Sequence, residues 1–321
     1  MAQRFGWLLL AWALTLGCNS AQNGRSRLDP ALTAFVPPDA VMLTGVRMDE
    51  VRTTPLYQKL LANKRLTQFD DFARRTGFDP RTDVRELIVT SRGADVLMAA
   101  RGAFNVRESP KGVVKTGYKG FTLYTRGESG VALVDNSTAL AGTLQVVRAA
   151  LDRYKAGDRT GPSGLLARVR EIAPQNQLWM VSTGFGDVIT NRIPSDGNAA
   201  NFGRILQSLE NMTVVADLRA GINGYITGTC RTEPDAKNLG DAARGLVGMG
   251  RLSVPQDESE LLRLWDGIKV DQQQRTVKIT LDIPQDLVNR VLDKWGMGVS
   301  RPVAASWAGE SHRPESTRRP R

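Results

Sequence analysis

The stretch TVKITLDIP, residues 276–284, indicates most clearly how this chain folds. Apolar side chains at Val277, Ile279, Leu281 and Ile283 alternate with polar ones. Successive side chains of an extended strand point to opposite faces of its sheet, so this alternation is typical of a strand with one buried and one solvated face. The stretch therefore predicts a sheet that other elements cover on at least one side.

A clear helix signal lies before this strand in the sequence. Thr232 and Asp235 form a capping box with Pro234 in the first turn, and they predict a helix start. The apolar residues that follow line one helical face: Ala236, Leu239, Ala243, Leu246 and Val247. Strands and helices of this kind recur throughout the chain, which indicates the α+β class.

One order of elements occurs twice along the chain: strand, helix, two strands, a variable piece, two strands, helix. A segment rich in Gly, Asp and Pro at 157–164 separates the two runs. We therefore expect two similar halves, residues 37–157 and 158–298, each an antiparallel or mixed sheet covered by helices. Their shared order suggests an internal duplication.

The first residues are typical of an export signal. Arg4 is followed by a run without charge from Phe5 to Leu16, and then by Gly17 and Cys18. This run is too short to span a membrane, which takes roughly 20 apolar residues. We expect residues 1–18 to be a signal peptide, 19–36 a polar spacer, and 299–321 a disordered basic tail.

Gly17 and Cys18 resemble the lipobox of bacterial lipoproteins, in which the cysteine is acylated and becomes the new N-terminus. The resemblance implies a membrane anchor at Cys18, on the periplasmic face of a membrane. Asn19, in place of an aspartate, favours the outer membrane. Thr15 departs from the leucine that is usual there. The alternative of ordinary cleavage, giving a soluble periplasmic or secreted protein, therefore stays open.

The chain carries a formal net charge of +10. One dense stretch, opposed only by Glu108, is a candidate surface for an anionic partner: Arg101, Arg107, Lys111, Lys115, Lys119 and Arg126. The partners expected of an exported protein are anionic lipid, a cell-wall polymer or an envelope protein, and not nucleic acid. The alternative is solvated charge on loops and strand faces.

Several kinds of chemistry are excluded. The one histidine, His312, lies in the tail, so histidine-based nucleophile triads and zinc sites are not expected. No phosphate-binding loop or nucleophile elbow occurs. We predict no catalytic residues, no metal and no cofactor. Asp79 and Asp83 could serve calcium, although aspartates in such turns usually bind the local backbone. Cys230 is expected to be a buried thiol.

Two pairs of polar residues have simple interpretations. Asp217 and Arg219 lie two residues apart on one face of a strand, which predicts an exposed ion pair. Asp70 and Asp71 are adjacent on a helix, so they point in different directions and are not expected to share a site.

The second half, at 218–252, 267–270 and 277–283, resembles domains of unknown function in exported proteins of acidobacteria and similar lineages. The run FDPRTDVREL, residues 78–87, resembles the same group. The resemblance implies no activity and no catalytic residues.

Together these observations predict a non-catalytic cell-envelope lipoprotein that binds or scaffolds an envelope partner. One alternative is an envelope hydrolase built on carboxylates, which requires two or more of them in a deep pocket with raised pKa values. Another is a receptor for a small ligand, with a closed apolar cavity between the halves.

Overall fold

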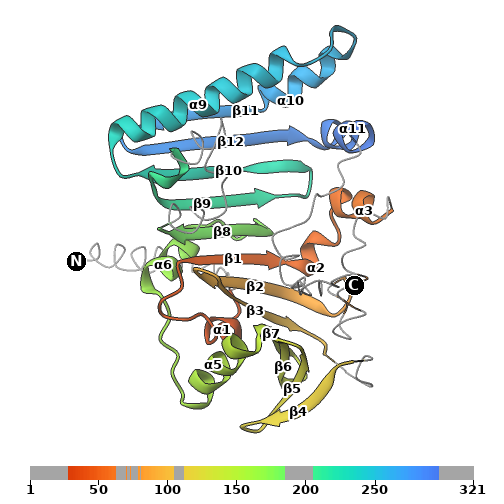
Figure 1. The fold of residues 1–321 in the computed structure, drawn as a ribbon. Coiled ribbons are helices and arrows are strands. Elements are labelled where there is room, and N and C mark those ends of the chain that lie inside the picture. The colour runs from red at the N-terminus through yellow and green to blue at the C-terminus, as the bar shows by residue number, and fades with distance from the viewer. Residues whose placement is uncertain are drawn as a thin grey trace, which may run out of the picture.

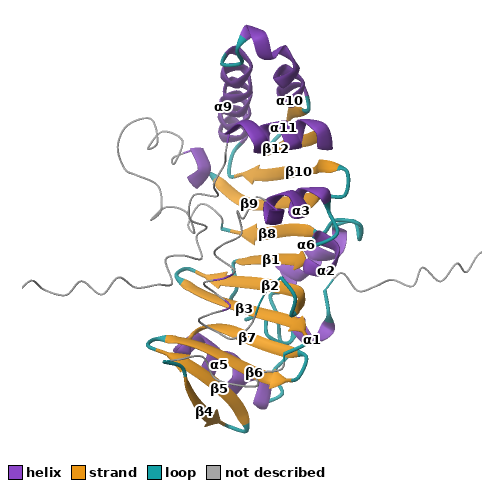
Figure 2. Cartoon of the chain, turned by 90° about the vertical axis from the view of Figure 1, so that its right-hand side faces the viewer, coloured by secondary structure: helices purple, strands orange, loops and turns teal. Residues whose placement is uncertain are grey.

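The computed structural model describes residues 28–62, 70, 73, 79, 81–104, 112–184 and 205–295. Within these residues the chain forms one twelve-stranded sheet, in the order β11-β12-β10-β9-β8-β1-β2-β3-β7-β6-β5-β4, and every pair of neighbours is antiparallel (Figure 1). Its strands are β1 (Met42–Arg47), β2 (Val84–Arg92), β3 (Asp95–Gly102), β4 (Val114–Tyr118), β5 (Phe121–Arg126), β6 (Ser129–Asp135), β7 (Thr138–Thr143), β8 (Leu178–Thr183), β9 (Leu209–Asp217), β10 (Gly221–Cys230), β11 (Ile268–Gln273) and β12 (Thr276–Pro284). Figure 2 shows the same succession of strands from a second direction.

The prediction of two similar halves, each with its own sheet, is wrong. Strand β1 pairs with β2 on one side and with β8 on the other, so Met42 lies opposite both Ser91 and Ser182. The sheet therefore continues across the boundary expected at 157–164, with seven strands before that segment and five after it. Pairing β1 with β8 satisfies backbone groups that two separate sheets would each leave open at an edge. The internal duplication, which was predicted from the shared order of elements, is not decided by this continuity and stays a prediction.

Helices lie on both faces of the sheet. One face, here called the α5 face, is covered by α1 (Pro30–Thr33), α5 (Leu144–Lys155) and α6 (Ser163–Glu171), whose buried residues share a core with the early strands, β8 and β9. The opposite face packs against α2 (Met48–Val51), α3 (Pro55–Ala62), α9 (Glu233–Leu252), α10 (Leu262–Asp266) and α11 (Gln285–Trp295). A 3-10 turn, η2 (Gln256–Leu261), joins α9 to α10.

Several local predictions are confirmed. The alternation in β12 buries Val277 and Ile283. The side chain of Thr232 accepts a hydrogen bond from the backbone N–H of Asp235 at 3.2 Å and so caps α9. Cys230 is fully buried, and burial raises the pKa of its thiol.

Residues 28–36 are not a polar spacer, as was expected for 19–36. Leu28, Leu32, Phe35 and Val36 are all buried in the core of the α5 face. Asp29 caps α1 by accepting from the N–H of Ala31 at 2.8 Å. The chain therefore runs over the α5 face before it reaches β1. Burying its apolar side chains there is favourable because it removes apolar surface from water.

Candidate anion-binding site

The described members of the predicted basic stretch are divided between the two faces of the sheet. Arg107 and Lys111 lie outside the described residues, as does Cys18. Arg101 is on the α5 face, where it pairs with Asp29 at 3.0 Å and donates to Ser137 at 2.7 Å.

The other described members of the stretch lie elsewhere. Lys119 forms the turn between β4 and β5 and pairs with Asp152 of α5 at 2.7 Å. Lys115 pairs across the strands with Tyr124, which places it and Arg126 on the sheet face opposite Arg101. Arg101 and Lys119 therefore contact elements of the α5 face, whereas Lys115 and Arg126 lie on the other face of the sheet.

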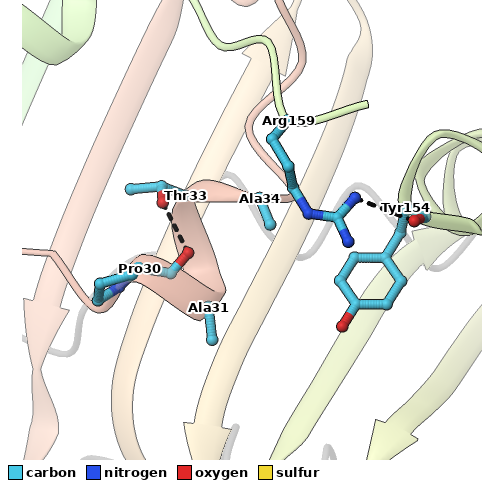
Figure 3. Close-up of a pocket in the computed structure, with 6 residues that line it drawn as sticks. All are labelled: Pro30, Ala31, Thr33, Ala34, Tyr154 and Arg159. Atoms are coloured by element: carbon cyan, nitrogen blue, oxygen red, sulfur yellow. Dashed lines mark hydrogen bonds between the residues drawn. The ribbon is translucent and has the colours of Figure 1, made fainter. Parts of the chain in front are cut away.

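A pocket lies instead between α1 and the C-terminal end of α5. Its volume is about 360 Å³, and it is open to solvent on one side. Four of its lining residues, Pro30, Ala31, Thr33 and Ala34, come from α1 and the residue after it, and Tyr154 and Arg159 complete it (Figure 3). The cap at Asp29 positions α1, and the cap at Thr143 begins α5.

Arg159 and Tyr154 form the polar side of the pocket. The guanidinium carbon of Arg159 lies 4.1 Å from the centre of the Tyr154 ring. Its Nη1 donates to the carbonyl oxygens of Tyr154 at 2.9 Å and Asp158 at 3.3 Å. The Tyr154 ring stacks on Phe35 at 4.8 Å and meets the edge of Phe121 at 6.1 Å. A cation held in this way is suited to binding an anion.

The surrounding helices are also positively charged. Residues 144–172 contain six Lys or Arg side chains and three carboxylates. Among the described residues, no ion pair involves Arg148, Lys155, Arg168 or Arg170. Arg148, Lys155 and Arg170 are exposed, and exposed cations favour the approach of an anionic partner.

Asp158, the acid nearest in sequence to Arg159, is already engaged. The backbone N–H of Thr160, its hydroxyl and the Arg153 side chain lower the pKa of Asp158 to about 2. Its carboxylate pairs with Arg153 at 3.1 Å. Asp158 therefore does not neutralise Arg159.

The two carboxylates considered for calcium, Asp79 and Asp83, have structural partners. Asp79 accepts from the N–H of Arg81 at 2.9 Å, and the Asp83 carboxylate accepts from the N–H of Asp79 at 2.8 Å, which confirms the local turn bonds. The Arg81 side chain is the main cause of the lowered pKa of Asp79. Among the described residues no group of three or more His, Cys, Asp or Glu side chains could hold a metal ion.

Two further carboxylates bear on the predictions. Asp217 pairs with Arg219, as expected, and the hydrogen bond from that side chain lowers the pKa of Asp217 to about 2. Burial raises the pKa of Glu86, whose Oε1 accepts from the N–H of Asp29 at 3.3 Å. Neither Glu86 nor any other carboxylate lines the pocket.

Sequence reasoning missed the pocket. Arg159 lies in the segment interpreted as a boundary, and α1 lies in the segment interpreted as a spacer. The pair Asp29-Pro30, an N-cap followed by proline, was the local signal that could have located α1. No local signal brings residues 30–34 beside Tyr154, because that contact joins segments about 120 positions apart.

The similarity of this chain to known proteins is limited to solved structures. No family model and no curated protein matches it. Among solved structures it is similar to three crystal forms of TP0453. Form I has 10% identity and a TM-score of 0.47 over 83% of this chain and 96% of that one. Form III has 12% identity and a TM-score of 0.48, over 83% of this chain and 98% of that one. Form IV has 10% identity and a TM-score of 0.47, over 81% of this chain and 95% of that one. At this level of similarity no site residue is carried over.

None of the described helices is long and apolar enough to cross a membrane.

Proposed function

We propose that this protein is a non-catalytic, exported envelope lipoprotein that binds an anionic partner with the helices of the α5 face. The observation that carries the proposal is the set of exposed cations on α5 and α6, Arg148, Lys155 and Arg170, which lie outside the ion pairs of the described residues. We propose with it that the chain is related to the exported domains of acidobacterial type.

The position of the chain's entry supports an anchored arrangement. Leu28 packs on the α5 face, and Cys18 precedes it by ten residues. Ten residues span at most about 35 Å when fully extended. A lipid on Cys18 would therefore hold Leu28, where the chain enters the α5 face, within that distance of the membrane, where anionic headgroups are concentrated.

Two matched triple variants of the mature chain test the binding face. R148Q/K155Q/R170Q removes three exposed cations from α5 and α6, and K237Q/K269Q/K278Q removes three exposed cations from α9, β11 and β12. Both lose the same net charge. On a dextran sulfate column we expect the first variant to elute at clearly lower salt than the second. Identical elution would show that only the overall charge matters and would overturn the proposed binding site on α5 and α6.

The anchor has its own test. Mass spectrometry of the mature N-terminus should find acyl chains on Cys18, and Cys18→Ser should release the protein from the membrane fraction. An unmodified amine at Cys18, or cleavage at another residue, would show a soluble exported protein instead.

A further inference from the structure

We propose that the pocket formed by α1, Tyr154 and Arg159 binds one phosphate-type oxyanion of an amphiphilic ligand. This inference rests on the proposed function, because it names the ligand chemistry for one part of the α5 face. It follows from three features of the pocket: the uncommitted donors of Arg159, the apolar wall opposite them, and the lack of a lining carboxylate.

The guanidinium of Arg159 is held in place and still has donors to offer. Two carbonyl oxygens, those of Tyr154 and Asp158, accept from Nη1. Among the described residues, the N–H groups of Nε and Nη2 have no hydrogen-bond partner. These two nitrogens share one edge of the planar guanidinium, which is the geometry that binds two oxygens of one phosphate or carboxylate.

The Tyr154 ring keeps this edge in position. It lies between the Arg159 guanidinium and Phe35, whose side chain is only 1% exposed. A guanidinium that is ordered before the ligand arrives loses less entropy on binding.

The opposite wall of the pocket is apolar. Pro30, Ala31 and Ala34 provide it (Figure 3). The hydroxyl of Thr33, the polar group on this side, already donates to the carbonyl of Pro30 at 2.7 Å. A small inorganic ion would leave this wall in contact with water, whereas a ligand with an apolar part beside its oxyanion would cover it.

Two sources could supply this chemistry, a phospholipid headgroup or free phosphate, and calorimetric titration of the mature chain separates them. The probes are monomeric dihexanoyl phosphatidylglycerol, inorganic phosphate and uncharged dihexanoylglycerol. We expect the phosphatidylglycerol to bind most tightly. Arg159→Gln should weaken it at least tenfold, and Arg159→Lys should give an intermediate affinity because lysine keeps the charge but lacks the planar edge.

Two further variants serve as pocket probe and control. Ala31→Phe fills the apolar wall without changing a charge, and it should also weaken phosphatidylglycerol at least tenfold. Lys278→Gln removes a cation that lies 5.2 Å from the centre of the Tyr225 ring at the other end of the sheet. Its affinity for the phosphatidylglycerol should lie within twofold of that of the unaltered protein.

Each outcome of these titrations supports or overturns a named part of the inference. Phosphate binding that equals lipid binding, disappears in Arg159→Gln and persists in Ala31→Phe would keep the oxyanion site, assign it to free phosphate and overturn the amphiphilic ligand. Unchanged affinity in Arg159→Gln, or equal affinity for uncharged dihexanoylglycerol, would overturn the inference. If Arg159→Gln loses the ligand while the two triple variants elute alike, the pocket is supported and the broader binding surface on α5 and α6 is not. If Arg159→Gln binds normally while R148Q/K155Q/R170Q elutes earlier, the broader surface is supported and the pocket is not.

Discussion

Gly45 of β1 shows how a single residue can control the packing of this sheet. A Cβ atom there would lie 2.2 Å from Cζ2 of Trp179, whose ring covers the glycine and is 4% exposed. Gly45→Ala should therefore lower the free energy of unfolding by about 1–3 kcal/mol, the usual cost of overpacking a core. Urea unfolding measures it. Gly117→Ala is the matched control, because a Cβ on that strand residue meets nothing within 4 Å; equal effects of the two variants would contradict the packing argument.

Glu86 predicts a dependence of stability on pH. Burial raises the pKa of Glu86 above its ordinary value of 4.5. The folded protein thus favours the protonated form of the Glu86 carboxyl group. The stability that this protonated form contributes is present below pH 4.5 and is lost as pH rises through the folded-state pKa. Glu86→Gln should raise the melting temperature at pH 7, and the gain should shrink toward zero below about pH 4. A lower melting temperature at pH 7 would mean that the ionised carboxylate is a net stabilising partner.

At the residue scale, the predictions that succeeded concern near neighbours in sequence. The Asp217–Arg219 pair and the bond from Arg81 to Asp79 each span two residues, so local geometry decides them. The Arg159 pocket and the Arg101–Asp29 pair join distant segments. Spacing along the chain carries no information about such contacts, and this is why the candidate site emerged only from the fold.

At the scale of the element, the entry segment 28–36 gives the clearest prediction. Phe35 is 1% exposed and stacks on Tyr154. Phe35→Ala should lower the free energy of unfolding by about 3–5 kcal/mol, as large-to-small substitutions in cores do, whereas a residue of a spacer would cost nothing. Chemical denaturation measures the loss, with Val114→Ala on the edge strand β4 as the control because Val114 is 59% exposed. A cost as small as that of the control would contradict the burial of this segment.

Elements were predictable where a periodic pattern extended over many residues. The alternation in β12 and the capped helix α9 are of this kind, and both are confirmed. The entry segment is short, and its Leu28, Leu32 and Phe35 follow no long periodic run. Its burial depends on the sheet that lies beneath it, which the segment itself does not encode.

At the scale of the whole molecule, the α+β class was predicted correctly, and the division into two similar halves, each with its own antiparallel or mixed sheet, was wrong. The order of elements can be read from local patterns, but it does not say whether β1 and β8 are edges or partners. Contacts beyond the sheet also join the two parts. Lys59 of α3 pairs with Asp293 of α11 at 2.7 Å, and its Nζ donates to the carbonyl of Asn289 at 3.0 Å.

This continuity makes a final prediction about unfolding. Trp179, Val181 and Val215 of β8 and β9 belong to the same buried cluster as Leu43 and Ile88 of β1 and β2. Neither part can lose its strands without exposing the core of the other, so the mature chain should unfold in one cooperative transition. Tryptophan fluorescence and far-ultraviolet circular dichroism should then give coincident denaturation curves, and Trp179→Ala should shift both together. Two separated transitions, only one of which moves in Trp179→Ala, would show that the parts fold independently despite their shared sheet.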